Sequence, residues 1–241
     1  MQKEITIGSA AAYHTYPDGG GKHPGLIVIE EIWGLNDHIK DVANRFAAEG
    51  FSVLSPELLP ESLLGMVTPQ LQQDMFDPEK RDEVQPKLRA AMGPMQQPKY
   101  AGDTVATLKA CVDYLLADEG VSGAVGVVGF CFGGTYSFHL AANDPRIKAA
   151  APFYGQAPAP EEIPNIACPI LAFYGEKDEH LMQTLPQLKE DMQKSGKQFE
   201  AVVYPNVGHA FFNDTNPRTY DADTAKDAWG KVLAFLKANL A

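Results

Sequence analysis

The sequence predicts an α/β fold with a mostly parallel central sheet and helices on both faces. Short apolar runs of strand length alternate with segments whose apolar residues recur at helical spacing. Most of these runs are apolar throughout, as in strands that are buried on both faces. Repeated strand–helix units imply a parallel sheet. No linker, charge block or internal repeat divides the chain, so we expect one domain over residues 1–241.

The first elements are two segments of alternating polarity, KEITIG and AAYHTYP, which predict an antiparallel hairpin on the sheet edge. PGLIVIE (residues 24–30) then predicts a buried strand. A helix follows, which Asn36 or Asp37 can cap and Gly50 can stop. FSVLSP (residues 51–56) predicts the next strand.

Residues 58–99 interrupt this alternation. They are rich in Pro, Met and Gln, show weak periodicity, and are long for a connection between two elements. We interpret them as an excursion over the sheet that lines a pocket.

Strand–helix units resume after the excursion. The predicted strands cover residues 124–129, 147–155, 169–175 and 199–205, and the predicted helices cover residues 102–120, 134–143, 184–196 and 221–240.

Composition argues against several classes of function. The net charge of −11 repels phosphate backbones and anionic membranes, so we expect neither nucleic acid nor a membrane as a partner. The N-terminus lacks an apolar core of signal-peptide length, and no stretch reaches about 18 apolar residues. Three cysteines without zinc-type spacing favour a reducing cytoplasm, without disulfides or a structural metal. Oligomeric state stays open, and a monomer is compatible with the sequence.

The stretch GFCFGG (residues 129–134) carries the clearest chemical signal. It joins a predicted strand to a predicted helix, and Cys131 stands where such a turn lifts a nucleophile above the sheet. Glycines at 129 and 133 relieve crowding on both sides. The helix N-terminus favours a thiolate and a nearby oxyanion, so we read Cys131 as a nucleophile rather than a small buried hydrophobe.

Two later loops supply partners for this nucleophile. Asp178 follows one predicted strand and His209 follows the next, which gives the order nucleophile, acid, histidine. We predict that His209 is the general base and that Asp178 orients it. Alone, the aspartate would be read as a turn former and the histidine as structural.

The segment EEIWG ends the strand at residues 24–30 with two carboxylates, Glu30 and Glu31. If that strand alternates, one of the two side chains points into the site. The N–H groups of Ile32 and Phe132 are candidates for an oxyanion hole.

Together, EEIWG, GFCFGG, GEKDEH and GHAF resemble, in order, four motifs of the dienelactone hydrolase (carboxymethylenebutenolidase) family. The resemblance covers nearly the whole chain and implies an α/β-hydrolase fold with a Cys131–His209–Asp178 triad. It also implies that Glu31 restrains the Cys131 thiol at rest and that Ile32 and Phe132 donate to the oxyanion.

One family position departs from the pattern. Asn213 stands where family enzymes acting on dienelactone carry an arginine that grips the substrate carboxylate. Arg81 or Arg89 could correspond to a second family arginine. We assign Trp33, Arg81, Tyr154, Phe211 and Asn213 to the substrate pocket, although the aromatic residues could equally be packing.

A cysteine nucleophile favours substrates with good leaving groups, because a thiolate attacks readily but an amide needs strong leaving-group protonation. The prediction is therefore a cytoplasmic hydrolase of carboxylic esters or lactones that forms an acyl-enzyme thioester and needs no cofactor or metal. One alternative is a general carboxylesterase or thioesterase of this fold. Another is a ligand-binding or sensor protein that keeps the fold with little turnover.

Overall fold

The computed structural model describes residues 1–77 and 79–241, with all their side chains except those at positions 69, 76 and 81. Within these residues eight strands form one sheet, in the order β1-β2-β4-β3-β5-β6-β7-β8. The strands are β1 (Gln2–Ile7), β2 (Ala10–Thr15), β3 (His23–Ile29), β4 (Ser52–Pro56), β5 (Val121–Phe130), β6 (Ile147–Phe153), β7 (Ile170–Gly175) and β8 (Phe199–Tyr204).

The sheet is parallel from β4 to β8 and antiparallel at one edge. There β1 pairs with β2, and β2 pairs with β4, with Ala12 opposite Pro56. The remaining neighbours pair in parallel. This arrangement confirms the predicted α/β class and the predicted edge hairpin.

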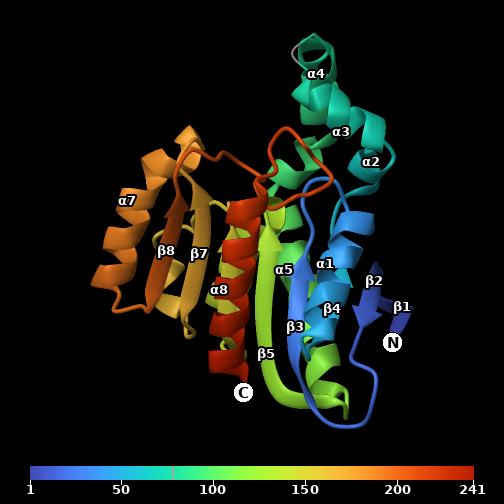
Figure 1. Cartoon of the computed structure of the whole chain (residues 1–241), viewed down its shortest axis with the longest axis vertical. Coiled ribbons are helices and arrows are strands. Elements are labelled where there is room, and N and C mark those ends of the chain that lie inside the picture. The colour runs from blue at the N-terminus through green and yellow to red at the C-terminus, as the bar shows by residue number, and fades with distance from the viewer. Residues whose placement is uncertain (78) are drawn as a thin grey trace.

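Helices cover both faces of the sheet. Figure 1 shows α1 and α8 in front of it and α5 behind. The helices are α1 (Asp37–Ala48), α2 (Glu61–Leu64), α3 (Pro69–Phe76), α4 (Arg81–Ala91), α5 (Pro98–Ala117), α6 (Phe132–Asn143), α7 (Glu179–Lys194) and α8 (Ala222–Leu240), with short 3₁₀ turns at Gly93–Gln96 and Ile163–Asn165.

The first helix follows the sequence prediction closely. The Asn36 side chain accepts a hydrogen bond from the Ile39 N–H at 3.1 Å, which caps the free amides of the first turn. The apolar residues at helical spacing, among them Val42 and Phe46, are fully buried against the sheet.

Three helices begin earlier than predicted, α6 by two residues and α5 and α7 by four and five. Helix α5 starts at Pro98, whose fixed φ suits a first helical position. Helix α7 starts at Glu179, five residues before the predicted Thr184, because the buried stripe extends back to Leu181. Helix α7 therefore begins directly after Asp178, which anchors that residue at the edge of the sheet.

The excursion at residues 58–99 contains α2, α3 and α4, which extend beyond the carboxyl ends of the strands (Figure 1). Hydrogen bonds tie its two ends to the body of the protein. The Tyr100 hydroxyl donates to the Leu58 carbonyl at 2.8 Å, and the Leu58 N–H donates to the Glu30 carboxyl at 2.8 Å. None of the helices in the described residues is long and apolar enough to cross a membrane.

Candidate active site

The turn between β5 and α6 holds Cys131 in a left-handed backbone conformation, with φ of 55°. Such a φ is strained for a residue with a Cβ and marks a position that its surroundings impose. The Cys131 N–H donates to the Phe153 carbonyl, and the Gly133 N–H donates to the Glu30 carbonyl, both at 3.0 Å. These bonds fix the turn between β3 and β6.

Position 129 requires a glycine because the backbone of Gly133 lies very close to it, and not because of its φ angle. A Cβ there would lie 2.0 Å from the Gly133 carbonyl oxygen. A Cβ at Gly133 would in turn lie 2.3 Å from the Ile29 carbonyl oxygen. No side chain fits in either place, so β3, β5 and α6 meet here backbone against backbone.

Asp178 and His209 come together at the same edge of the sheet, from the loops after β7 and β8. The His209 ring donates from Nδ1 to Asp178 Oδ2 at 2.5 Å. That bond leaves Nε2 as the ring nitrogen for the Cys131 sulfur, with which His209 also interacts. The three residues thus form one chain from sulfur to carboxylate.

The charge state of His209 reflects this position. Its side chain is 43% exposed on the open side, but protein groups crowd the rest of the ring, and that desolvation opposes protonation. The Cys131 sulfur and the Asp178 carboxylate outweigh desolvation and hold the pKa of His209 well above 6.5. The arrangement stabilises an imidazolium beside the sulfur.

Glu31 is buried and its two oxygens bind two neutral donors. The Tyr154 hydroxyl donates to Oε1 at 3.1 Å, and the Asn213 amide donates to Oε2 at 2.5 Å. Among the described residues no hydrogen bond joins Glu31 to Cys131, and the bonds of Glu31 go to Tyr154 and Asn213. The expected contact between this carboxylate and the thiol is therefore replaced by a Tyr154–Glu31–Asn213 cluster.

Tyr154 lies between Glu31 and His209. Its backbone has φ of 38°, and its ring centroid lies 5.0 Å from that of His209. Burial, together with the charges of Glu31 and Cys131, raises the pKa of its hydroxyl well above 10. The hydroxyl therefore remains a donor to Glu31.

Ile32 and Phe132 are the residues whose amides the sequence suggests as oxyanion donors. Phe132 is the first residue of α6, between the Cys131 and Gly133 amides, which already donate to backbone carbonyls. Ile32 lies in the turn after β3, where the Gly34 N–H returns to the Glu31 carbonyl at 3.2 Å. Neither amide donates to another of the described residues.

The remaining pocket candidates differ in location. Trp33 is 8% exposed at the start of the loop after β3. Phe211 has no exposed surface and packs on Tyr154 and Tyr204, with ring centroids 5.5 and 5.4 Å away, so it belongs to the core. Asn213 is 1% exposed and holds Glu31. The Arg81 side chain lies outside the described residues.

Glu30 was left as an alternative to Glu31 by the sequence, and its environment is different. It is fully buried, and Oε1 accepts the N–H groups of Leu58 and Leu59 at 2.8 and 3.1 Å. Burial raises its pKa to about 8, against those two donors. Glu30 is thus a neutral acid at pH 7 that fastens the start of the excursion.

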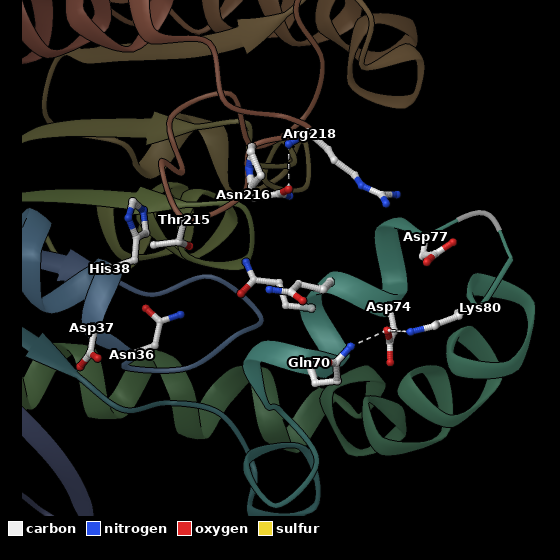
Figure 2. Close-up of a pocket in the computed structure, with 13 residues that line it drawn as sticks. Asn36, Asp37, His38, Gln70, Asp74, Asp77, Lys80, Thr215, Asn216 and Arg218 are labelled. Atoms are coloured by element: carbon white, nitrogen blue, oxygen red, sulfur yellow. Dashed lines mark hydrogen bonds and ion pairs between the residues drawn. The ribbon is translucent and has the colours of Figure 1, made fainter.

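A cavity of about 530 Å³ lies beyond Asn213, and its described lining does not include Cys131, Asp178 or His209. Its walls come from residues 36–38, from positions between 70 and 80, and from residues 215–218. Figure 2 shows His38, Thr215, Asn216 and Arg218 on one side of this cavity and Gln70, Asp74, Asp77 and Lys80 on the other. Thr215 connects the two sites, because its hydroxyl donates to Asn213 Oδ1 at 2.6 Å.

A sheet of this order, with a strained residue between β5 and α6 and an acid and a histidine after β7 and β8, defines an α/β-hydrolase fold. The comparisons with known proteins name the family within it. The sequence profile of the dienelactone hydrolase family matches residues 10–240. The chain belongs to that family of hydrolases.

Three individual proteins show how similar known members and structures are to this chain. A protein of Saccharolobus solfataricus with the provisional name carboxymethylenebutenolidase is 34% identical, over 98% of each chain. Protein usf of Aquifex pyrophilus is also 34% identical, over 95% of this chain and 93% of its own. A crystal structure from Klebsiella pneumoniae, provisionally described as a dienelactone hydrolase, has 26% identity, a TM-score of 0.79 and 98% coverage of both chains.

Proposed function

We propose that this protein hydrolyses carboxylic esters or lactones through a Cys131–His209–Asp178 triad and a thioester acyl-enzyme, without a cofactor. The observation that carries the proposal is the position of His209, bound through Nδ1 to Asp178 and adjacent to the sulfur at the strained turn. Membership of the dienelactone hydrolase family supports the same class of reaction.

In the first half of the reaction the thiolate of Cys131 attacks the substrate carbonyl carbon. The carbonyl electron pair moves to oxygen, and the N–H groups of Ile32 and Phe132 stabilise the oxyanion. When the tetrahedral intermediate collapses, the C–O bond breaks and the leaving alkoxide takes a proton from His209 Nε2. The products are an alcohol and a thioester on Cys131.

In the second half water attacks the thioester while His209 Nε2 takes one of its protons. The C–S bond then breaks, the carboxylic acid leaves, and the thiolate–imidazolium pair is restored. Asp178 holds the Nδ1–H tautomer throughout, so Nε2 always faces the reacting atoms. For a lactone, the same two steps open the ring.

Glu31 acts in this scheme as a fixed charge near the thiolate. A neighbouring anion disfavours ionisation of a thiol, so an ionised Glu31 moderates the reactivity of Cys131 at rest. Tyr154 and Asn213 keep it in place by hydrogen bonding. Because the Asn213 amide is used on Glu31, we propose neutral esters and lactones as substrates rather than ones with a carboxylate beside the scissile bond.

The proposal is tested with p-nitrophenyl acetate and a panel of neutral lactones. Wild type should show turnover and a burst of p-nitrophenol, with a mass increase of one acetyl group on Cys131 after acid quenching. His209→Ala should lower kcat about 10²–10⁴-fold in a folded protein. Absence of turnover on the whole panel, or an adduct on Cys111 or Cys168, would remove the proposal and favour a ligand-binding role.

A further inference from the structure

The peptide between Cys131 and Phe132 carries the strained nucleophile on one side and a proposed oxyanion donor on the other. Cys131 has φ of 55° and ψ of −110°, which lies outside the regions that suit a residue with a Cβ. The peptide is trans, so its N–H points in the direction opposite to its C=O. A group that holds the Cys131 carbonyl therefore also sets the direction of the Phe132 N–H.

Thr135 holds this carbonyl with two groups. Its backbone N–H donates to the Cys131 oxygen at 3.1 Å, which is the ordinary first bond of a helix, and its hydroxyl donates to the same oxygen at 3.4 Å. Threonine hydroxyls often bond the carbonyl four residues earlier in a helix. Here, however, that carbonyl belongs to the peptide whose N–H serves the proposed reaction.

A further contact fixes the direction of the hydroxyl hydrogen. The Gln156 N–H donates to Thr135 Oγ1 at 2.9 Å. The hydroxyl oxygen thus accepts a bond from outside the helix, and its own hydrogen is directed to the Cys131 carbonyl. Because linked hydrogen bonds polarise one another, the accepted bond strengthens the donated one.

The same hydroxyl joins the two left-handed turns of the site. Gln156 lies two residues after Tyr154, whose φ is 38°. Between them, Gly155 packs directly on the start of α6, where a Cβ on Gly155 would lie 2.2 Å from the Gly134 carbonyl carbon. This close packing and the hydrogen bond from Gln156 to Thr135 leave the loop after β6 and the first turn of α6 little room to move separately.

We propose that Thr135 is a positioning residue: its hydroxyl holds the Cys131 carbonyl and so keeps the Phe132 N–H turned towards the substrate oxyanion. The inference rests on the proposed function, because only a reaction through an oxyanion uses that N–H. Loss of the hydroxyl leaves the backbone bond in place, but the strained peptide can then rotate towards a relaxed geometry, and stabilisation of the oxyanion weakens. Reactions of the sulfur that form no oxyanion should not change.

Thr135→Val tests this role, since it keeps the shape of the side chain and removes the hydroxyl. Turnover of p-nitrophenyl acetate should fall about two- to tenfold, the range for one hydrogen bond, whereas Thr135→Ser should keep most of the wild-type rate. Butyraldehyde is a second probe: the Cys131 sulfur adds to its carbonyl carbon, and the carbonyl oxygen takes a proton. Its affinity should fall by about the same factor as turnover. Alkylation of Cys131 by iodoacetamide is a displacement at saturated carbon, and its rate should not change.

Thr107→Val is the matched control. The Thr107 hydroxyl also donates to the carbonyl four residues before it, that of Asp103 at 3.0 Å, but in α5. This variant should leave turnover, aldehyde affinity and alkylation unchanged. If Thr135→Val does not fold, Thr135→Ala is measured in the same three ways.

The inference is overturned if the variant without the hydroxyl matches wild type in turnover and aldehyde affinity, if its alkylation slows as much as its turnover, or if Thr135→Ser is equally impaired. A wild-type protein without turnover would count against the proposed function, and aldehyde affinity measured against the alkylation rate would still decide whether Thr135 sets the direction of the N–H.

Discussion

The turn around Cys131 and the excursion at residues 58–99 are built in opposite ways. At the turn, three backbone segments meet so closely that no Cβ fits at Gly129 or Gly133. The excursion, by contrast, is tied to the body by side-chain hydrogen bonds from Glu30 and Tyr100. A region held by backbone contact tolerates almost no substitution, whereas one held by side chains can change its contacts without disturbing the chemistry.

The largest expected effect is on stability, and it tests how closely the backbone segments pack at the turn around Cys131. Gly129→Ala places a methyl group 2.0 Å from the Gly133 carbonyl oxygen, so the free energy of unfolding should fall by at least about 3 kcal/mol. Gly230→Ala is the matched control, since nothing lies within 4 Å of its Cβ in α8. It should stabilise by up to about 1 kcal/mol. The measurement is urea unfolding of both variants. Equal stability of Gly129→Ala and Gly230→Ala would disprove the close packing at Gly129.

The next effect concerns Glu30, the residue that joins the two regions. Its pKa of about 8 lies above 4.5, so the folded state holds a proton that the unfolded state loses. The contribution of Glu30 to the free energy of unfolding should therefore be fully present below pH 4.5 and be lost as the pH rises towards 8. Glu30→Gln removes this dependence and should stabilise the protein at pH 7 by roughly 2–3 kcal/mol.

The measurement for Glu30 is urea unfolding at several pH values from 5 to 9. The difference between wild type and Glu30→Gln isolates this one group. Glu57→Gln, which removes a neighbouring acid at a more exposed position, should leave most of the slope in place. Parallel curves for wild type and Glu30→Gln would show that Glu30 ionises normally.

The adjacent glutamate should affect reactivity rather than stability across this pH range. Replacing Glu31 by Gln removes the anion near Cys131, so alkylation by iodoacetamide near neutral pH should be about tenfold faster, with a lower midpoint. Glu30→Gln serves as control because Glu30 is neutral at pH 7. A midpoint that is unchanged or higher in Glu31→Gln would show that Glu31 does not moderate the thiol.

The smallest expected effect is at the far end of the excursion. Tyr100→Phe removes the hydroxyl that donates to the Leu58 carbonyl at 2.8 Å, which should cost about 1 kcal/mol. Turnover of p-nitrophenyl acetate should stay within about twofold, because Cys131 and its partners are untouched. Proteolysis within residues 58–99 should become faster. A loss of turnover as large as that of His209→Ala would mean that the excursion supports the chemistry directly.

The same contrast explains what the sequence could predict. The turn at Cys131 is a local pattern of glycines between a strand and a helix, so residues 129–134 were sufficient to find it. The strand ends that carry Asp178 and His209 follow from periodicity. The excursion helices have glutamine where a buried stripe would be apolar, as at Gln72, and gave no clear periodic signal.

The hydrogen-bond donors of Glu31 could not be predicted from the sequence, for a different reason. Tyr154 and Asn213 lie 123 and 182 residues from it along the chain. Their pairing depends on how β3, β6 and the loop after β8 meet in space. Neither an aromatic residue after a strand nor a single asparagine carries a signal for such a contact. His38 and Asp214, 176 residues apart, were missed in the same way.

The Tyr154–Glu31–Asn213 cluster also sets an order of events during synthesis. Glu31 emerges early from the ribosome, but its second donor is made 182 residues later. A carboxylate cannot be buried cheaply without its partners. The carboxyl edge of β3 must therefore stay hydrated in the nascent chain, and the thiol of Cys131 is exposed to solvent chemistry until the last strand and its loop arrive. Burial of this carboxylate is therefore completed only when the loop after β8 has been made and packs against the end of β3.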